Sequence, residues 1–178
     1  MKEVTIESTR IELKKGDITR QDDIQAVVNA ANAELRTGGG VAGAIHRAAG
    51  SELAQGTSSM APINPGEAVI SQAYNLPNDY VIHCLGPVYG RDKPEEELLA
   101  NCYRNALNLT DKNEIESIAF PAISTGAFGY PVKGAATVAF MAIKAIADRL
   151  KTVKLIRFVI WGDEKLRIHE EVMDEVFG

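Results

Sequence analysis

Residues 27–49 read VVNAANAELRTGGGVAGAIHRAA, and this stretch decides more about the fold than any other. An apolar strand runs into two asparagines, Asn29 and Asn32, and a glycine triplet at 38–40 leads into a helix that is expected to begin at Val41. Glycines free backbone amides, and amides beside a helix N-terminus form a site for an anion such as phosphate. The asparagines add neutral groups that hydrogen-bond sugar hydroxyls or position water. The pattern therefore indicates a ligand with phosphates and a ribose.

The bulk properties are those of one globular domain spanning residues 1–178. The chain is 46% hydrophobic, and a chain of this length buries about 70% of its unfolded surface without a disulfide or metal. The net charge of −5 argues against extended nucleic-acid binding, which needs a basic patch. No apolar run is long enough to cross a membrane, so no membrane partner is expected, and the cytoplasm is the expected location.

Apolar periodicity predicts strands that alternate with helices. Residues 4–6 and 11–13 alternate as an edge hairpin does, and apolar runs predict further strands at 24–28, 67–74, 80–85, 117–120 and 155–161. Helices are expected at 41–50, from 94 to 107, at 131–150 and from 166 to 176. Asp163 is expected to cap the last helix, and the Ser-, Gly- and Pro-rich residues 51–65 are expected to form a surface loop. Cys84 and Cys102 are expected to be buried free thiols.

This alternation predicts an α/β sandwich. Its central sheet is expected to be mixed but largely parallel, with the hairpin and the 67–85 pair as antiparallel additions. Ligands bind such sheets beyond the carboxyl ends of the strands. Polar or glycine-rich segments follow strands at 16–19, 29–43, 123–130 and 161–163. We therefore expect these segments to meet at one edge of the sheet.

A second glycine-rich turn lies between a strand and a helix at residues 123–131. Its amides are placed to hold a second phosphate. Phe128, between Gly126 and Gly129, either packs on a sugar face or lies in the core. Asp17 either accepts a hydrogen bond from the exocyclic amine of a base or serves as a turn residue. Trp161 either stacks on a base or is a core aromatic.

Several other site types do not fit the sequence. Gly38, Gly40 and Gly43 have the spacing of a dinucleotide-binding loop, but ten residues separate them from the preceding strand, which disfavours an NAD-dependent oxidoreductase. No Walker-type motif occurs, and the histidines and cysteines lack metal-ligand spacing. No local signature of a nucleophilic triad is present. His46 is interpreted as a hydrogen-bonding residue on a helix face, and His83 as a core residue.

The combination resembles the macrodomain family, in particular its MacroD-type branch, over nearly the whole chain. The motifs that carry the resemblance are GDIT (16–19), VNAAN (28–32), GGGV (38–41), IHRAAG (45–50), YVIH (80–83), GP (86–87) and AFPAISTG (119–126). The resemblance implies a three-layer α/β/α sandwich that binds ADP-ribose or an ADP-ribosylated protein. It implies no cofactor and no metal, and a monomer is the default expectation.

The resemblance also implies roles by matching position. Asp17 is expected to hold the adenine amine and Ile18 to contact the base or supply backbone, while Asn32 touches the distal ribose and helps to place water. Around the diphosphate and distal ribose, the implied ligand-binding residues are Asn29, Gly39, Gly40, Val41, Ala42 and Gly43 on one side, and Ser124, Thr125, Gly126, Ala127 and Phe128 on the other. Trp161 matches an aromatic that some members place near adenine.

One departure from the family pattern concerns catalysis. MacroD-type hydrolases usually carry Asp where this chain has Ala42. The first hypothesis is a hydrolase that removes ADP-ribose from acidic side chains or deacetylates O-acetyl-ADP-ribose. Its water would be positioned by Asn32, the loop amides and a ligand phosphate, without a strong protein base. The second hypothesis, which the loss of the Asp favours, is a binding module that recognises ADP-ribose without turnover.

Overall fold

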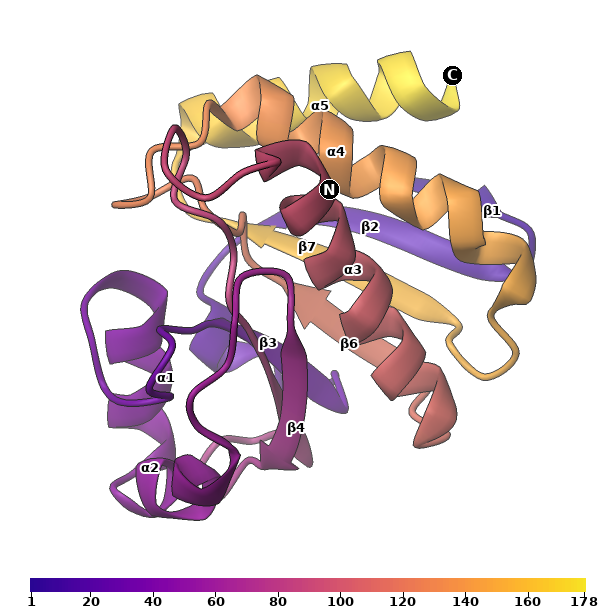
Figure 1. The fold of residues 1–178 in the computed structure, drawn as a ribbon. Helices are drawn as coiled ribbons and strands as arrows, with labels where there is room; N and C mark the ends of the chain where they lie inside the picture. The colour runs from indigo at the N-terminus through magenta and orange to yellow at the C-terminus, as the bar shows by residue number, and fades with distance from the viewer.

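The computed structural model describes all residues 1–178 and contains a seven-stranded sheet with strand order β1-β2-β7-β6-β3-β5-β4 (Figure 1). The strands are β1 Lys2–Ile6, β2 Thr9–Lys15, β3 Ala26–Ala30, β4 Ala68–Gln72, β5 Tyr80–Cys84, β6 Ser117–Phe120 and β7 Leu155–Ile160. Strands β2, β7, β6, β3 and β5 run parallel, whereas β1 and β4 pair antiparallel at the two edges. The expected mixed, largely parallel sheet is confirmed.

Helices cover both faces of the sheet. They are α1 Gly40–Ala49, α2 Glu52–Thr57, α3 Glu95–Lys112, α4 Val132–Ile146 and α5 Asp163–Phe177. Figure 1 shows α3, α4 and α5 on one side of the sheet and α1 with α2 on the other. Neighbouring residues of β3 reach both sides, since Val28 packs in the core under α3 to α5 and Val27 in the core under α1 and α2. The fold is thus the three-layer α/β/α sandwich that the sequence predicts.

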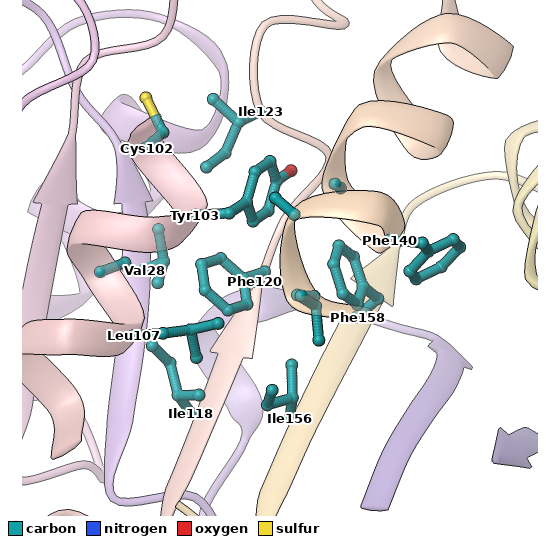
Figure 2. Packing of buried hydrophobic residues seen from close by; sticks show 14 of the residues in the cluster. Val28, Cys102, Tyr103, Leu107, Ile118, Phe120, Ile123, Phe140, Ile156 and Phe158 are labelled. Carbon is teal, nitrogen blue, oxygen red and sulfur yellow. The ribbon is translucent and has the colours of Figure 1, made fainter. Parts of the chain in front are cut away.

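The larger core is built around aromatic side chains. Phe158 of β7 is fully buried, and its ring centroid lies 5.6 Å from that of Phe120, 4.9 Å from Phe140 and 5.9 Å from Tyr103 (Figure 2). These rings join strands β6 and β7 to helices α3 and α4. Such tilted and offset contacts add to the burial of apolar area. This layer fixes the positions of the central strands, and therefore of the loops at their ends.

The structure differs from the sequence-based expectation at residues 51–65. This segment holds helix α2 and a 3-10 turn at Ser58–Met60 instead of a surface loop. Leu53 is fully buried, and the Thr57 hydroxyl donates to the Leu53 and Leu35 carbonyls at 3.1 and 3.3 Å. The Ser and Gly content misled the prediction because one buried leucine and one satisfied hydroxyl are enough to fix a short helix here.

Two helix ends also differ. The long apolar helix ends at Ile146, and it is not buried all round, because Met141 is 52% exposed. Asp163 is the first residue of α5 and not its cap, which is Gly162 at φ 102°. The Asp163 carboxylate instead accepts from Lys15 Nζ at 2.6 Å.

Cys84 and Cys102 are buried free thiols as expected, and no helix is long and apolar enough to span a membrane.

We predict that Phe158→Ala lowers the free energy of unfolding by about 3–5 kcal/mol, because it removes a ring that packs between four elements and leaves a cavity. Urea denaturation measures the loss. The control is Met141→Ala on the exposed face of α4, which should change stability by less than about 0.5 kcal/mol. Equal effects of the two substitutions would contradict this account of the core.

Candidate functional site

The two glycine-rich segments face one hollow of about 290 Å³ at the carboxyl edge of the sheet. The lining residues are Ala30, Ala31, Asn32, Gly38, Gly39, Gly40, Val41, Ala42, Gly86, Ala122, Ile123, Ser124, Gly126, Ala127 and Phe128. They follow β3, β5 and β6, whose carboxyl ends lie together because these strands are parallel. A larger hollow of about 520 Å³ lies beside β4 and α3, but no glycine-rich turn lines it.

The first turn presents the N-terminus of α1 to the hollow. Helix α1 begins at Gly40, and its N-cap Gly39 supplies no side-chain hydrogen bond to the first amides. Gly40 adopts φ 56°, a left-handed conformation that favours glycine. A Cβ on Gly43 would overlap the Gly38 carbonyl, so glycine is needed there for the helix to pack on its own loop. The uncapped amides and the helix dipole favour a bound anion.

The second turn is held rigidly by its own hydroxyls. Ser124, at φ 68°, donates through Oγ to the Pro87 carbonyl at 2.9 Å, and Thr125 Oγ1 donates to the Ala122 carbonyl at 2.8 Å. Both hydroxyls therefore fix the loop, and Thr125 does not line the hollow. Phe128 is half-buried and lines the hollow, which excludes the alternative of a fully buried core residue.

Asn32 lies in the hollow with its amide oriented by the backbone. Its Nδ2 donates to the Arg36 carbonyl at 2.8 Å, and its Oδ1 accepts from the Arg36 amide at 3.0 Å. A primary amide has two donor hydrogens and two acceptor lone pairs. One donor and one acceptor position thus remain for a ligand or water. The double contact with Arg36 sets the direction in which they point.

Asn29 does not line the hollow. This residue is fully buried in β3, and its Nδ2 donates to His83 Nδ1 at 3.1 Å. The His83 ring therefore carries its proton on Nε2 and donates to Ser71 Oγ at 2.9 Å, while the Ser71 hydroxyl donates to the Gln72 carbonyl. Asn29 thus joins the site-bearing strand β3 to β5 instead of facing a ligand.

His46 also differs from its interpretation as a hydrogen-bonding residue. It is buried in α1, and its Nε2 has no hydrogen-bond partner. Burial lowers the pKa of His46, so its ring is held neutral.

The other predicted residues lie along the same edge, at the ends of β2 and β7. Lys15 pairs with Ile160, which places Asp17 and Trp161 just beyond two neighbouring strand ends. Trp161 is 78% exposed and is therefore no core aromatic, whereas Ile18 is 7% exposed and packs in the smaller core. From β2 to β3 the sheet order spans three strand spacings, roughly 14 Å.

Asp17 keeps one carboxylate oxygen available. Its Oδ1 accepts from the Thr19 amide at 2.9 Å and from the Thr19 hydroxyl at 2.7 Å. The Oδ2 atom has only the exposed Arg20 Nε near it, at 3.9 Å. The hydrogen bonds from the Thr19 hydroxyl and amide lower the pKa of Asp17, so this group is anionic at neutral pH. Asp17 therefore combines the predicted turn role with a free acceptor.

Sequence reasoning assigned no role to Gly86, which lines the hollow. A Cβ at this position would overlap Ser124 Oγ, so Gly86 allows the segment after β5 to touch the second turn. The Gly-Pro pair at 86–87 was the available signal. No group of three or more His, Cys, Asp or Glu side chains is placed to hold a metal ion.

We predict that His83 makes stability fall in acid. Burial lowers the pKa of His83 from 6.5 to about 3. Below pH 6.5 the unfolded chain binds a proton here that the folded chain excludes until about pH 3, so stability is lost as the pH falls through this window, by up to about 1.4 kcal/mol per pH unit. Urea denaturation between about pH 7 and 4 should show a shallower dependence for His83→Gln. Parallel curves would contradict the assignment.

Comparisons with known proteins agree with this geometry. The Macro domain family model matches residues 28–139. A Cronobacter turicensis protein named O-acetyl-ADP-ribose deacetylase is 42% identical over 173 residues, which cover 94% of this chain and 98% of that protein. The structure matches an Oceanobacillus iheyensis macrodomain with ADP at a TM-score of 0.94 and 37% identity, covering 99% and 96% of the two chains.

A Trypanosoma brucei macrodomain in complex with ADP-ribose matches at a TM-score of 0.84 and 34% identity, covering 90% of this chain and 68% of that one. The family model covers more than half of the present chain, and the relatives match it nearly end to end. This chain therefore belongs to the macro domain family.

Proposed function

We propose that this protein binds ADP-ribose along the carboxyl edge of its sheet and hydrolyses ADP-ribosyl esters. The observation that carries the proposal is the pair of turns, around Gly39 and Gly126, that face a single hollow. Amides of both turns surround the diphosphate, and no Lys or Arg lines the hollow. The distal ribose lies against Phe128 and Asn32. We also propose that residues 1–178 act as one domain, as a monomer in the cytoplasm.

The adenosine half extends toward the ends of β2 and β7. Asp17 Oδ2 accepts a hydrogen bond from the exocyclic amine of adenine, Ile18 contributes its backbone to the base site because its side chain is buried, and the base stacks on the exposed face of Trp161. The span of roughly 14 Å between β2 and β3 separates the base site from the hollow. A ligand with a nucleoside at one end and a second sugar beyond a diphosphate fits this separation.

In the proposed reaction, a water molecule cleaves the ester that joins the distal ribose to an acyl group. The water attacks the anomeric carbon of the distal ribose that is joined to an acidic side chain, or the acyl carbon of O-acetyl-ADP-ribose, and the C–O bond from that carbon to the leaving oxygen breaks to give a carboxylic acid and ADP-ribose. The remaining donor and acceptor of Asn32 orient the water, and a ligand phosphate takes its proton. Catalysis rests on positioning and fixed dipoles.

Relatives named O-acetyl-ADP-ribose deacetylase, at 42% identity, support the hydrolase. One observation favours the second candidate, a non-catalytic ADP-ribose-binding module. Ala42 in the first turn of α1 is buried and provides no carboxylate beside the hollow. We still favour the hydrolase, because Asn32, the loop amides and the ligand phosphate perform the proposed reaction without that carboxylate.

Titration calorimetry with ADP-ribose tests the binding. We expect a Kd near the micromolar range, about −8 kcal/mol. Asp17→Ala should weaken binding by about 1–3 kcal/mol, since it removes a charged hydrogen-bond acceptor. Lys112→Ala is the matched surface control. Lys112 lines the larger hollow beside β4 and not the candidate site, so this substitution should leave the Kd unchanged. Absence of binding heat with the unmodified protein would overturn the proposal.

Turnover separates the two candidates. With a carboxylate-linked mono-ADP-ribosylated protein or O-acetyl-ADP-ribose as substrate, we expect the protein to release ADP-ribose. Asn32→Asp keeps an acceptor for the Arg36 amide but loses the donor, so the rate should fall at least about tenfold while ADP-ribose still binds. Tight binding without release by the unmodified protein would establish the binding module. A higher rate in Ala42→Asp would show that the missing carboxylate limits turnover.

A further inference from the structure

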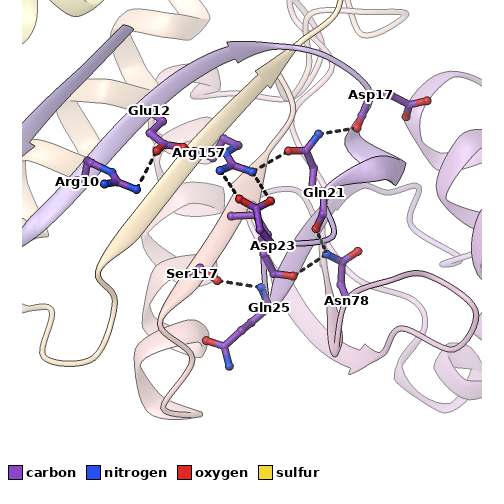
Figure 3. Close-up of polar contacts among 10 residues, drawn as sticks. Arg10, Glu12, Asp17, Gln21, Asp23, Gln25, Asn78, Ser117 and Arg157 are labelled. Atoms are coloured by element: carbon purple, nitrogen blue, oxygen red, sulfur yellow. Dashed lines mark hydrogen bonds and ion pairs between the residues drawn. The ribbon is translucent and has the colours of Figure 1, made fainter. Parts of the chain in front are cut away.

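An ion-pair network around the buried Arg157 lies beside the Asp17 turn (Figure 3), and none of its residues lines the hollow. Arg157 of β7 is only 5% exposed. Its Nε donates to Glu12 Oε2 at 2.8 Å, and its Nη1 and Nη2 donate to the two Asp23 carboxylate oxygens at 2.8 Å each. Arg10 approaches the other Glu12 oxygen at 3.0 Å. Two cations and two anions therefore balance, which is the condition for keeping a guanidinium buried.

The network fixes the direction of one neutral side chain, Gln21. Arg157 Nη1 also donates to Gln21 Oε1 at 3.0 Å. A guanidinium has donors only, so it holds the oxygen end of the Gln21 amide and turns the nitrogen end away. That nitrogen, Nε2, donates to the backbone carbonyl of Asp17 at 2.8 Å. The side-chain amide of Asn78 in turn donates, through Nδ2, to the backbone carbonyl of Gln21 at 2.7 Å.

The Gln21 contact holds the backbone of the short turn at Asp17 from outside the turn. Asp17 caps a 3-10 helix of only three residues, Ile18–Arg20. Its carbonyl accepts from the Arg20 amide at 3.1 Å as well as from Gln21. The Asp17 side chain is 40% exposed, and its carboxylate is held within the turn by the Thr19 amide and hydroxyl, so its direction follows that of the turn. Without Gln21, one backbone hydrogen bond alone would fix the carbonyl.

We propose that Gln21, held by Arg157, is a positioning residue that sets the preference for adenine by fixing the direction of the Asp17 carboxylate. This inference rests on the proposed function, in which Asp17 Oδ2 meets the exocyclic amine. A fixed carboxylate accepts from the amine of adenine and repels the carbonyl oxygen that replaces this amine in hypoxanthine. A carboxylate that swings with its turn relieves the repulsion and weakens the attraction, so discrimination falls.

The test compares the Kd values of ADP-ribose and of its hypoxanthine analogue by calorimetry. Gln21→Met keeps the length of the side chain but removes both hydrogen bonds. We expect it to lower the ratio of the two affinities about three- to tenfold, mainly by weakening ADP-ribose. In an Asp17→Ala background the same substitution should leave the ratio unchanged, because the two residues act through one contact.

Gln25→Met is the matched control. Gln25 Oε1 accepts from the Glu116 amide at 2.7 Å, beyond the opposite edge of the sheet, so this variant loses a comparable hydrogen bond without touching the Asp17 turn. Its affinity ratio should equal that of the unmodified protein. If Gln21→Met does not fold, Gln21→Glu keeps an oxygen for Arg157, replaces the donor to Asp17 with a charged oxygen that repels the Asp17 carbonyl, and should lower the ratio in the same way.

The outcomes separate the two proposals. Equal weakening of both ligands by Gln21→Met, or the same loss in Gln25→Met, would overturn the positioning role. A lower ratio in Asp17→Ala with no change in Gln21→Met would overturn that role and leave the base contact intact. An unchanged ratio in Asp17→Ala would remove the base contact of the proposed function, and the positioning role with it.

Discussion

The parallel alignment of β2, β7, β6, β3 and β5 is the constraint on which the site depends. Each of these strands must be followed by a connection that leaves the sheet at the same edge. Two of those connections are glycine-rich turns beside the hollow, and one of them opens helix α1 directly. Because the aromatic core around Phe158 fixes the strands, it also fixes the spacing between the turns. Packing energy far from the ligand thereby sets the geometry of the amides that are proposed to hold it.

A chain with a net charge of −5 can still offer an anion site, because the site is built from dipoles and not from cations. The residues that line the hollow include no charged side chain. Asp17 and the charge-balanced group around Arg157 lie outside the residues that line the hollow. Such a site selects its ligand by the positions of fixed hydrogen-bond donors. A small movement of a turn therefore changes ligand affinity more than a change in the net charge of the protein would.

The parts of the site that lie within one local segment were predictable from the sequence. Glycines at 38–40 and an apolar strand before them define a strand, a turn and a helix N-terminus, and the structure has all three. Contacts between distant segments were not predictable. Gln21 meets Arg157 across 136 residues, and no pattern near Gln21 marks it as different from any surface glutamine. Asn29 is the opposite case, since the motif marked it and only the structure shows that it is buried against His83 and does not line the hollow.

Two of the five non-glycine residues with positive φ lie in segments that border the candidate site. Leu35 and Ser124 both adopt positive φ, at 56° and 68°, and each lies in a segment that borders the hollow. Such conformations cost about 1–3 kcal/mol each and persist only when surrounding contacts hold them. For Ser124 the holding contact is its hydrogen bond to the Pro87 carbonyl, which the absence of a side chain on Gly86 allows. For Leu35 it is a fully buried side chain and the Thr57 hydroxyl on its carbonyl. Helix α2, which the composition of its segment concealed, therefore supports the first turn as the segment after β5 supports the second.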